Sequence, residues 1–330
     1  MDRNIKVSVI VPVYGVEKFV GRCVSSLMRQ TLDCIEYIFI DDCTPDLSMD
    51  IIKLIVESYP NRKDCVKYLR HNRNCGLPTA RNTGLRVATG KYIFHCDSDD
   101  YLEIDMLESL YSEAEAKHCD FVWCDWYLTF NTKSRIMSQP SAENLRHALT
   151  LMLSGAMRYN VWNKLVRHDL YIETGITFPD GCSMGEDMTM ICLAAKATKV
   201  SNVAKPLYHY VRTNTDSMTQ VYSDIHLKEL RENADTTCDF LLKNDLGVGI
   251  YKEINWFKLN VKLPFLFNGQ RKYFKMWRQW YTESHCDIMS NHFQPIHTRL
   301  LQWFAAHHLS LINLIYCRFI FNLFYSRFSK

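Results

Sequence analysis

The sequence lacks several features that would assign it to whole classes of protein. Its 330 residues carry a formal net charge of only +3, so no excess of basic charge indicates binding to nucleic acid. The 13 cysteines are odd in number and include no C-x-x-C pair, which argues against a disulfide framework and against a zinc site. We expect small, buried, reduced thiols instead.

Long apolar stretches are also absent. The first residues contain no apolar segment of the kind found in a signal peptide, and no run of about 18 apolar residues could span a membrane. The sequence shows no internal repeat and no low-complexity segment. These absences, together with the scattered cysteines, predict a globular protein of the cytoplasm.

The first half of the chain alternates short apolar runs with longer amphipathic segments. Runs of β-branched and aromatic residues predict strands, and apolar residues at helical spacing predict helices between them. The predicted strands are 7–11, 37–40, 66–69, 92–96 and 121–124, and the predicted helices are 16–28, 51–56, 77–88 and 104–117. This order is typical of an α/β fold with a mostly parallel sheet flanked by helices.

The alternation fades after about residue 127. Residues 141–220 predict mixed helices and loops that complete a first domain. From residue 224 onward the pattern is almost wholly helical and rich in aromatic residues. We therefore expect a first domain over 1–220 and a helical C-terminal region over 221–330.

Polar clusters follow four of the predicted strands, at 12–15, 41–42, 71–74 and 97–100. Ligands of open α/β sheets bind beyond the carboxyl ends of the strands, so these clusters predict one site at that edge. Any single cluster could be turn chemistry, but four at once are harder to explain in that way.

The acidic run Asp97-Ser98-Asp99-Asp100 directly follows a predicted buried strand. Carboxylates repel one another and are costly to desolvate, and a hard divalent cation with oxygen ligands is the usual solution. The alternative is that these acids cap the helix predicted to begin near Ile104.

Several segments resemble the family 2 glycosyltransferases. The segments are VIVPVY (9–14), SSLMRQT (25–31), IDDCTPD (40–46), NCGLPTARNTGL (74–85) and GKYIFHCDSDD (90–100). The resemblance is dense over residues 5–127 and sparser to about 220. One departure is Cys43, which adds a Cβ at a turn position that usually holds glycine.

The resemblance implies a GT-A fold, which is Rossmann-like, a nucleotide-diphosphate-sugar donor such as a UDP-sugar, a divalent metal (Mn²⁺ or Mg²⁺) and inversion at the anomeric carbon. It implies that Asp42 accepts a hydrogen bond from the base. The other residues implied at the donor are Pro12, Tyr14, Asp41, Asn74, Arg81, Asp97, Lys164, Arg212 and Ser217.

For the metal, the resemblance implies Asp99 as direct ligand, Asp97 at the ribose or the metal, and His209 in the metal shell. A histidine packed between two tyrosines is the alternative for His209. For Lys164 the alternative is an exposed lysine at a helix end.

An inverting transfer needs a base on the face opposite the leaving group. The acidic pair Glu186-Asp187 precedes an apolar helix predicted over 188–197, and the family pattern implies Asp187 as the base, with Glu186 as second choice. The alternative is that both acids cap that helix.

Two C-terminal segments indicate a surface for contacts. Residues 271–281 interleave basic and aromatic residues, and residues 309–328 are strongly apolar. Both suit a membrane interface, which would place the protein on the inner face of the cell membrane, or ordinary packing or contact with a second subunit in a homodimer.

The sequence therefore predicts a metal-dependent inverting glycosyltransferase of surface-polysaccharide assembly, which acts on a glycan or lipid-linked saccharide. A sugar nucleotidyltransferase would need a glycine-rich basic loop after the first strand, where this chain has Pro12-Val13-Tyr14-Gly15. A non-catalytic scaffold that binds sugar nucleotides and a phosphatase with a strand-end aspartate are the remaining alternatives.

Overall fold

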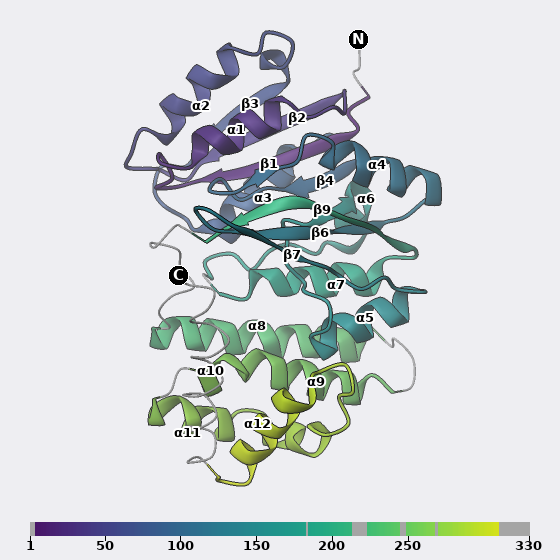
Figure 1. Cartoon of the computed structure of the whole chain (residues 1–330). Coiled ribbons are helices and arrows are strands. Elements are labelled where there is room, and N and C mark those ends of the chain that lie inside the picture. Colours follow the sequence, from purple (N-terminus) through teal and green to yellow (C-terminus); the bar gives the residue numbers. More distant parts are fainter. Residues whose placement is uncertain (1–3, 183, 213–222, 245–248, 268–269, 310–330) are drawn as a thin grey trace. The chain divides into compact units, whose positions relative to one another are not determined.

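The structure, a computed structural model, describes residues 4–182, 184–212, 223–244, 249–267 and 270–309 (Figure 1). The chain forms two compact units, one of residues 1–145 and 159–237 and one of residues 146–158 and 238–330. The first unit holds the sheet, and the second is helical. The second unit thus includes a short segment from the middle of the chain, which the sequence pattern did not single out.

One sheet runs through the first unit, with nine strands among the described residues in the order β3-β2-β1-β4-β8-β6-β9-β5, and with β7 paired to β6. The strands are β1 (Val7–Val13), β2 (Ile35–Asp41), β3 (Val66–Arg70), β4 (Tyr92–His95), β5 (Tyr101–Leu102), β6 (Phe121–Thr129), β7 (Ser134–Met137), β8 (Lys164–Arg167) and β9 (Val200–Val211). The first four strands are mutually parallel, and β9 is parallel to β6. The predicted α/β fold with a mostly parallel sheet is confirmed.

All five predicted strands are present, as β1, β2, β3, β4 and β6. The prediction of helices and loops alone over 141–220 was wrong, because β8 and β9 lie there. β8 has four residues and inserts antiparallel between β4 and β6. β9 is interrupted by a register shift near Pro206. Neither strand therefore shows a long apolar alternation.

Helices connect the strands and cover the sheet (Figure 1). In the first unit they are α1 (Val20–Met28), α2 (Ser48–Glu57), η1 (Lys63–Cys65), α3 (Leu77–Val87), α4 (Met106–Lys117), α6 (His168–Thr174), η2 (Glu186–Met188), α7 (Thr189–Lys196) and most of α8 (Asp224–Lys243). β1 and β2 are buried along their whole length, which makes them the centre of the core. Each cysteine in the described ranges is a free thiol, but the prediction that these thiols are buried was wrong for the exposed Cys34 and Cys286.

Gly84 brings α3 unusually close to the sheet. A Cβ built on Gly84 would lie 2.5 Å from Cγ2 of Ile10 in β1 and 3.0 Å from Cδ1 of Ile40 in β2. Only glycine fits such a close approach of helix and strand without a shift of the helix. The approach also sets the position of Arg81, one turn earlier on the same helix.

The second unit is helical, as predicted for the C-terminal region. Its elements are α5 (Leu145–Ser154), the end of α8, α9 (Tyr251–Lys262), α10 (Pro264–Phe267), α11 (Arg271–Gln279), η4 (Thr282–Asp287) and α12 (Ile296–Ala306). Of the predicted contact segment 309–328, only Leu309 lies within the described residues. Among the helices that the structure describes, none has the length and apolar character to cross a membrane.

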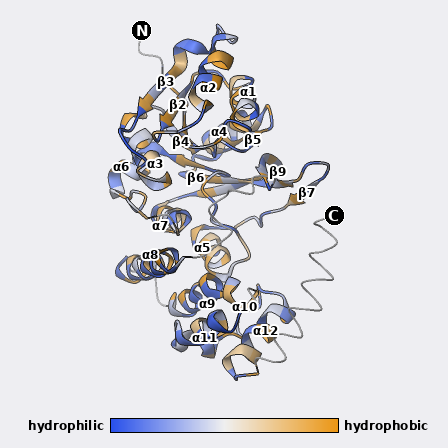
Figure 2. Ribbon diagram, turned by 90° about the vertical axis from the view of Figure 1, so that its left-hand side faces the viewer, coloured by the Kyte–Doolittle hydropathy of each residue, from blue (hydrophilic) through white to orange (hydrophobic). Residues whose placement is uncertain are grey.

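Helix α11 carries most of the other predicted contact segment, 271–281. Its aromatic residues Tyr273, Phe274 and Trp277 are buried within the second unit. Its exposed positions are mainly basic or polar, and the helix is largely hydrophilic in Figure 2. The aromatic rings of this segment therefore take part in ordinary packing.

Candidate functional site

The carboxyl ends of β1, β2, β3 and β4 lie side by side. Val13 is in register with Asp41, and Asp41 with Arg70. Just past the end of β4, the backbone N–H of Cys96 donates to the carbonyl of Ile10 at 3.0 Å. The polar clusters that follow these strands therefore share one edge of the sheet, which is where an open α/β sheet binds its ligand.

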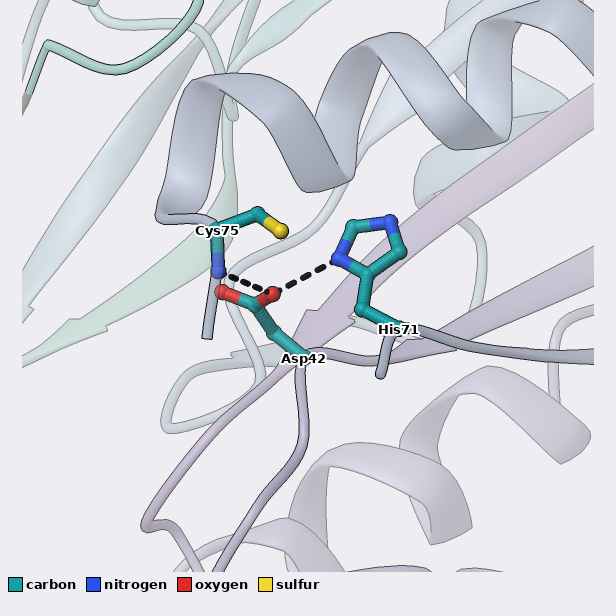
Figure 3. A group of neighbouring side chains, drawn as sticks. All are labelled: Asp42, His71 and Cys75. Atoms are coloured by element: carbon teal, nitrogen blue, oxygen red, sulfur yellow. Dashed lines mark hydrogen bonds and ion pairs between the residues drawn. The ribbon is translucent and has the colours of Figure 1, made fainter. Parts of the chain in front are cut away.

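Asp42 lies among the loops after β2 and β3, and is only 4% exposed (Figure 3). Its Oδ1 accepts the backbone N–H of Cys75 at 2.8 Å and is 2.7 Å from Nδ1 of His71. Its Oδ2 accepts the backbone N–H of Gly76 at 2.8 Å. Gly76 has a φ of +88°, a conformation that glycine adopts readily. Asp42 thus fixes the loop that leads into α3.

Other residues predicted at the nucleotide lie on the same edge. Oδ1 of Asn74 accepts the N–H of Gly76 at 3.0 Å, so Asn74 helps Asp42 to shape this loop. Asp41 accepts a backbone N–H of the following turn at 2.8 Å. The ring of Tyr14 is half exposed, whereas Pro12 is buried within β1.

The acidic run after β4 is divided by burial. Asp97 and Asp99 are partly exposed, whereas Asp100 is 1% exposed. Asp100 accepts the N–H of Val211 at 2.7 Å and the hydroxyl of Tyr208 at 2.9 Å. Burial raises the pKa of Asp100 well above its ordinary value, and the charges of Asp99 and Asp97 raise it further. Asp100 therefore anchors β9, whereas Asp97 and Asp99 stay partly exposed at the edge of the sheet.

Arg81 connects this run with the second acidic pair. Its side chain is 1% exposed, and Nη2 lies 2.8 Å from Oδ1 of Asp97. Burial lowers the pKa of Arg81, but the charges of Asp97, Glu186 and Asp187 raise it overall. Among the described residues, Nε and Nη1 of Arg81 have no hydrogen-bond partner. A buried donor without a partner costs about 1–3 kcal/mol, so these N–H groups are available to an anionic ligand.

Glu186 and Asp187 lie in η2, directly before α7. Oδ1 of Asp187 accepts the backbone N–H of Val161 at 3.0 Å. Burial raises the pKa of both carboxyl groups, the charge of Asp187 raises that of Glu186 further, and Arg81 opposes both shifts. Carboxyl groups with a raised pKa are suited to proton transfer near neutral pH.

Lys164 begins β8 and is 1% exposed, so the alternative of an exposed lysine at a helix end was wrong. Its Nζ donates to Oδ1 of Asn163 at 2.5 Å. Burial lowers the pKa of Lys164 to about 7, although Cys124 and Asp187 act to raise it. A buried lysine in this state can be neutral or charged near physiological pH.

His209 lies in β9, stacked between Tyr101 and Tyr127 with ring centroids 4.1 Å and 4.5 Å away. Its Nδ1 is 3.1 Å from Oγ1 of Thr129, and its Nε2 is 2.8 Å from Oε1 of Glu103. Protein groups thus bond to both ring nitrogens. The arrangement is that of a packed histidine, although the two tyrosines are not its neighbours in sequence.

The two remaining predicted residues follow β9. Arg212 is exposed, and its Nη1 lies 3.4 Å from the hydroxyl of Tyr210. Ser217 lies outside the described residues.

Sequence reasoning missed two contributors to the site. The hydroxyl of Tyr208 accepts the N–H of Asp97 at 3.2 Å and donates to Asp100, so it fixes the acidic run. Tyr208 is next to His209 in a segment already compared with the family, which was the available signal. Val161 acts through its backbone N–H, and no side-chain pattern indicates such a role.

A mostly parallel sheet with paired acids at its carboxyl edge, and a buried arginine that is affected by the charges of these acids and of a second acidic pair, is the arrangement expected of a nucleotide-sugar glycosyltransferase. The family described as "Glycosyl transferase family 2" matches residues 8–185. The chain belongs to this family, and the predicted glycosyltransferase activity is confirmed at the level of the class.

Relatives and solved structures agree with this assignment. The chain is 32% identical over 273 residues to the "Uncharacterized glycosyltransferase EpsJ" of Bacillus subtilis (strain 168), across 79% of this chain and 76% of EpsJ. It is 27% identical over 222 residues to "Poly(ribitol-phosphate) beta-N-acetylglucosaminyltransferase TarS" of Staphylococcus aureus (strain MW2), across 66% of this chain and 37% of TarS.

The crystal structure of S. aureus TarS 1-349 in complex with UDP-GlcNAc is similar with a TM-score of 0.62 and 21% identity, over 95% of this chain and 90% of that one. A mannosyltransferase of Pyrobaculum calidifontis in complex with GDP-Man and Mn²⁺ is similar with a TM-score of 0.52 and 13% identity, over 96% and 89%. These similarities confirm the GT-A fold.

Proposed function

We propose that this protein is a metal-dependent inverting glycosyltransferase that moves a sugar from a UDP-sugar to a hydroxyl group of a glycan or lipid-linked saccharide. The observation that carries the proposal is the buried guanidinium of Arg81, whose Nε and Nη1 have no hydrogen-bond partner in the part of the chain that the structure describes. It lies beside Asp97 and close enough to the acidic pair 186–187 to be affected by its charge. One arginine thus connects the predicted donor side of the site with the predicted base.

The donor binds along the carboxyl edge of the sheet. Asp42 accepts from the base, Tyr14 and Pro12 flank it, and Arg81 bonds to the diphosphate through Nε and Nη1, which suits a planar donor fork. Asp41, Asn74, Lys164, Arg212 and Ser217 complete the donor site. The UDP-GlcNAc bound by the S. aureus TarS structure supports uracil as the base.

The donor set at the end of β4 fits a hard divalent cation, Mn²⁺ or Mg²⁺. Asp97 and Asp99 offer partly exposed carboxylate oxygens, the ligand type that such ions prefer. Burial raises the pKa of the adjacent Asp100, and the negative charges of Asp99 and Asp97 raise it further. When bound, the cation neutralises charge on the diphosphate leaving group. The Mn²⁺ in the Pyrobaculum calidifontis structure supports a metal here. His209 would join the metal shell only if one ring nitrogen exchanged its contact with Thr129 or Glu103 for the ion.

Asp187 acts as the general base. It takes the proton of the acceptor hydroxyl while the hydroxyl oxygen attacks the anomeric carbon, and the bond from that carbon to the diphosphate oxygen breaks. The N–H of Val161 holds the carboxylate in place, and Glu186 shares the negative charge of the pair.

The acceptor is a glycan or lipid-linked saccharide at the inner face of the cell membrane. Support comes from TarS, whose name gives poly(ribitol-phosphate) as the molecule it glycosylates. The helical region 221–330, with segments 271–281 and 309–328, is the proposed surface for the acceptor, the membrane or a second subunit, and residues 1–220 the catalytic domain. Membership of the family argues against the nucleotidyltransferase and phosphatase alternatives.

A donor screen with a matched pair of variants tests the proposal. Wild-type protein is expected to show Mn²⁺-dependent thermal stabilisation by a UDP-sugar, followed by transfer. Arg81→Lys should weaken donor binding at least tenfold, because a lysine cannot make the paired contacts of a guanidinium. Arg86→Lys, on an exposed turn of the same helix, should leave binding unchanged. Equal binding by Arg81→Lys, or no binding of any nucleotide sugar by the wild type, would refute the proposal.

A further inference from the structure

Three side chains of different chemistry meet beside the edge of the sheet (Figure 3). They are Asp42 after β2, His71 after β3 and Cys75 before α3. One ligand atom from each, a carboxylate oxygen, an imidazole nitrogen and a thiol sulfur, lies within 4.8 Å of the other two. The thiol of Cys75 points toward the imidazole ring in Figure 3, so the three groups face a common point.

We propose that Asp42, His71 and Cys75 form a site for a soft divalent cation, with Zn²⁺ as the fitting ion, that is separate from the hard-cation site at Asp97 and Asp99. Zn²⁺ takes sulfur, nitrogen and oxygen ligands at about 2.0–2.3 Å, so ligand atoms on one ion are roughly 3.5 Å apart. Side-chain adjustments of about 1 Å bring the three atoms to that spacing. A fourth position stays open to water.

The surroundings of the three ligands favour metal binding. Nε2 of His71 lies 2.9 Å from Oγ1 of Thr83 in α3, which orients the ring. Metal-binding histidines usually have such a partner on the second nitrogen. Oδ2 of Asp42 accepts the N–H of Gly76 and Oδ1 accepts the N–H of Cys75, and these two bonds hold the carboxylate with Oδ1 beside His71. The carboxylate and the ring are therefore already oriented, although Oδ1 and Nδ1 have to move apart from 2.7 Å. The thiol has to turn away from the carbonyl of Arg73, to which it donates at 3.4 Å.

The chemistry of the ligands separates this site from that of the transferase cation. Mn²⁺ and Mg²⁺ prefer oxygen ligands, whereas thiolate and imidazole prefer Zn²⁺. Binding replaces the contact between Nδ1 of His71 and Asp42. The single proton of the neutral ring then resides on Nε2, where Thr83 accepts it. The thiol of Cys75 releases one proton to solvent, so affinity rises with pH.

Occupancy of this site has a consequence that rests on the proposed function. Asp42 is the proposed acceptor for the nucleotide base, and a metal bound to Oδ1 changes its charge and orientation. Zn²⁺ and the UDP moiety should therefore compete. A soft cation would act as an inhibitor of donor binding, in contrast to the activating hard cation.

Cobalt substitution tests the metal site directly. The full-length, reduced protein without nucleotide is titrated with Co²⁺, which gives a thiolate-to-cobalt charge-transfer band in the near ultraviolet when cysteine is a ligand. We expect one such band, which Zn²⁺ abolishes by displacement. Cys75→Ser should remove the band and weaken Zn²⁺ binding at least tenfold, and His71→Gln should do the same. Cys43→Ser, at another half-buried thiol, is the matched control and should keep both.

The outcomes separate this inference from the proposed function. No band in the wild type, or an equal band in Cys75→Ser, would overturn the metal site whatever the donor does. If wild-type protein binds UDP with equal affinity at zero and saturating Zn²⁺, the proposed competition between the two ligands is wrong. Failure of UDP to bind to metal-free wild-type protein and to Mn²⁺-loaded protein would instead count against the proposed function. Folding of each variant is checked by circular dichroism.

Discussion

At the scale of single residues, the most informative position is the one that departs from the family pattern. Cys43 follows the proposed base-recognition acid, and its φ of +58° lies in the left-handed region. A side chain with a Cβ pays about 1–2 kcal/mol there, whereas glycine does not. The turn therefore keeps the backbone that suits glycine, and the cysteine bears the strain.

Replacing Cys43 with glycine should stabilise the protein. We expect the free energy of unfolding to rise by about 0.5–1 kcal/mol, because relief of strain exceeds the extra entropy of an unfolded glycine. Urea denaturation measures this change. Cys65→Gly is the control, at a half-buried cysteine without a positive φ, and should lower stability. A loss of stability in Cys43→Gly would show that its side chain contributes packing that outweighs the strain.

Asp187 carries the second prediction at this scale. Asp187→Asn should leave donor binding nearly intact and slow transfer by about 100-fold or more, since only the proton acceptor is lost. Burial raises the pKa of Asp187 and Glu186, so the pair takes up a proton at a higher pH than ordinary carboxyl groups do. Wild-type activity should therefore fall as the pH drops, at a pH above the usual range for aspartate.

The measurement is the pH profile of transfer, together with donor affinity for each variant. Asp169→Asn, at an exposed acid of α6, is the control and should change neither. Loss of donor affinity in Asp187→Asn, or a low-pH limb at the ordinary pKa of aspartate, would place the base elsewhere.

At the scale of elements, the strands that could be predicted from the sequence are those whose own side chains form a clear apolar run. β1 and β2 are buried on both faces, so their apolar runs were visible in the sequence. β8 is four residues long and held by neighbours on both sides, and β9 owes its place to Asp100 and the long pairing with β6. Such strands depend on partners distant in sequence, which local pattern does not contain.

The site residues likewise divide into those visible in the local sequence and those that depend on partners distant in sequence. The strand-end acids were predicted because charges next to a buried strand are conspicuous in the sequence, whereas Arg81, inside α3, was predicted only from the resemblance to the family. The sequence left open whether His209 is packed or binds a metal, because the rings that enclose it come from β5 and β6. Backbone donors such as the N–H of Val161 carry no signal in residue types at all.

Substitutions at Asp100 and Asp99, two adjacent acids of the run, should have different effects, one on stability and the other on donor binding. Asp100→Ala leaves the N–H of Val211 and the hydroxyl of Tyr208 without their acceptor, so we expect a loss of about 2–3 kcal/mol in the free energy of unfolding. Asp99→Ala, at a partly exposed position, should change stability little but abolish metal-dependent donor binding. Denaturation and donor titration with Mn²⁺ measure both effects.

The pH dependence gives a further check on Asp100. Its pKa is raised in the folded state, so the folded protein binds this proton more tightly than the unfolded chain does. That contribution to stability is present below the unfolded pKa of about 4 and is lost as the pH rises through the folded value. Asp100→Ala should remove this decline. An equal decline in both proteins would mean that another group causes it.

At the scale of the whole molecule, the arrangement of charge bears on where the enzyme meets its acceptor. The net charge is only +3, yet α11 exposes Arg271, Lys272 and Lys275 while it buries its aromatic residues. Contact of this helix with a membrane would therefore be electrostatic and not an insertion of rings. Each basic side chain near an anionic surface contributes about 1 kcal/mol, and salt screens that attraction.

The full chain should pellet with anionic vesicles at low ionic strength, and added salt should release it. Lys272→Glu combined with Lys275→Glu should weaken this binding at least tenfold without a change in thermal stability, because both side chains are exposed. Lys53→Glu with Lys133→Glu, an exposed pair in the first unit, is the control. A chain that ends after Leu309 tests the apolar segment 310–328 separately. If that shorter chain pellets as well as the full one and the charge reversal on α11 has no effect, neither segment is the membrane contact.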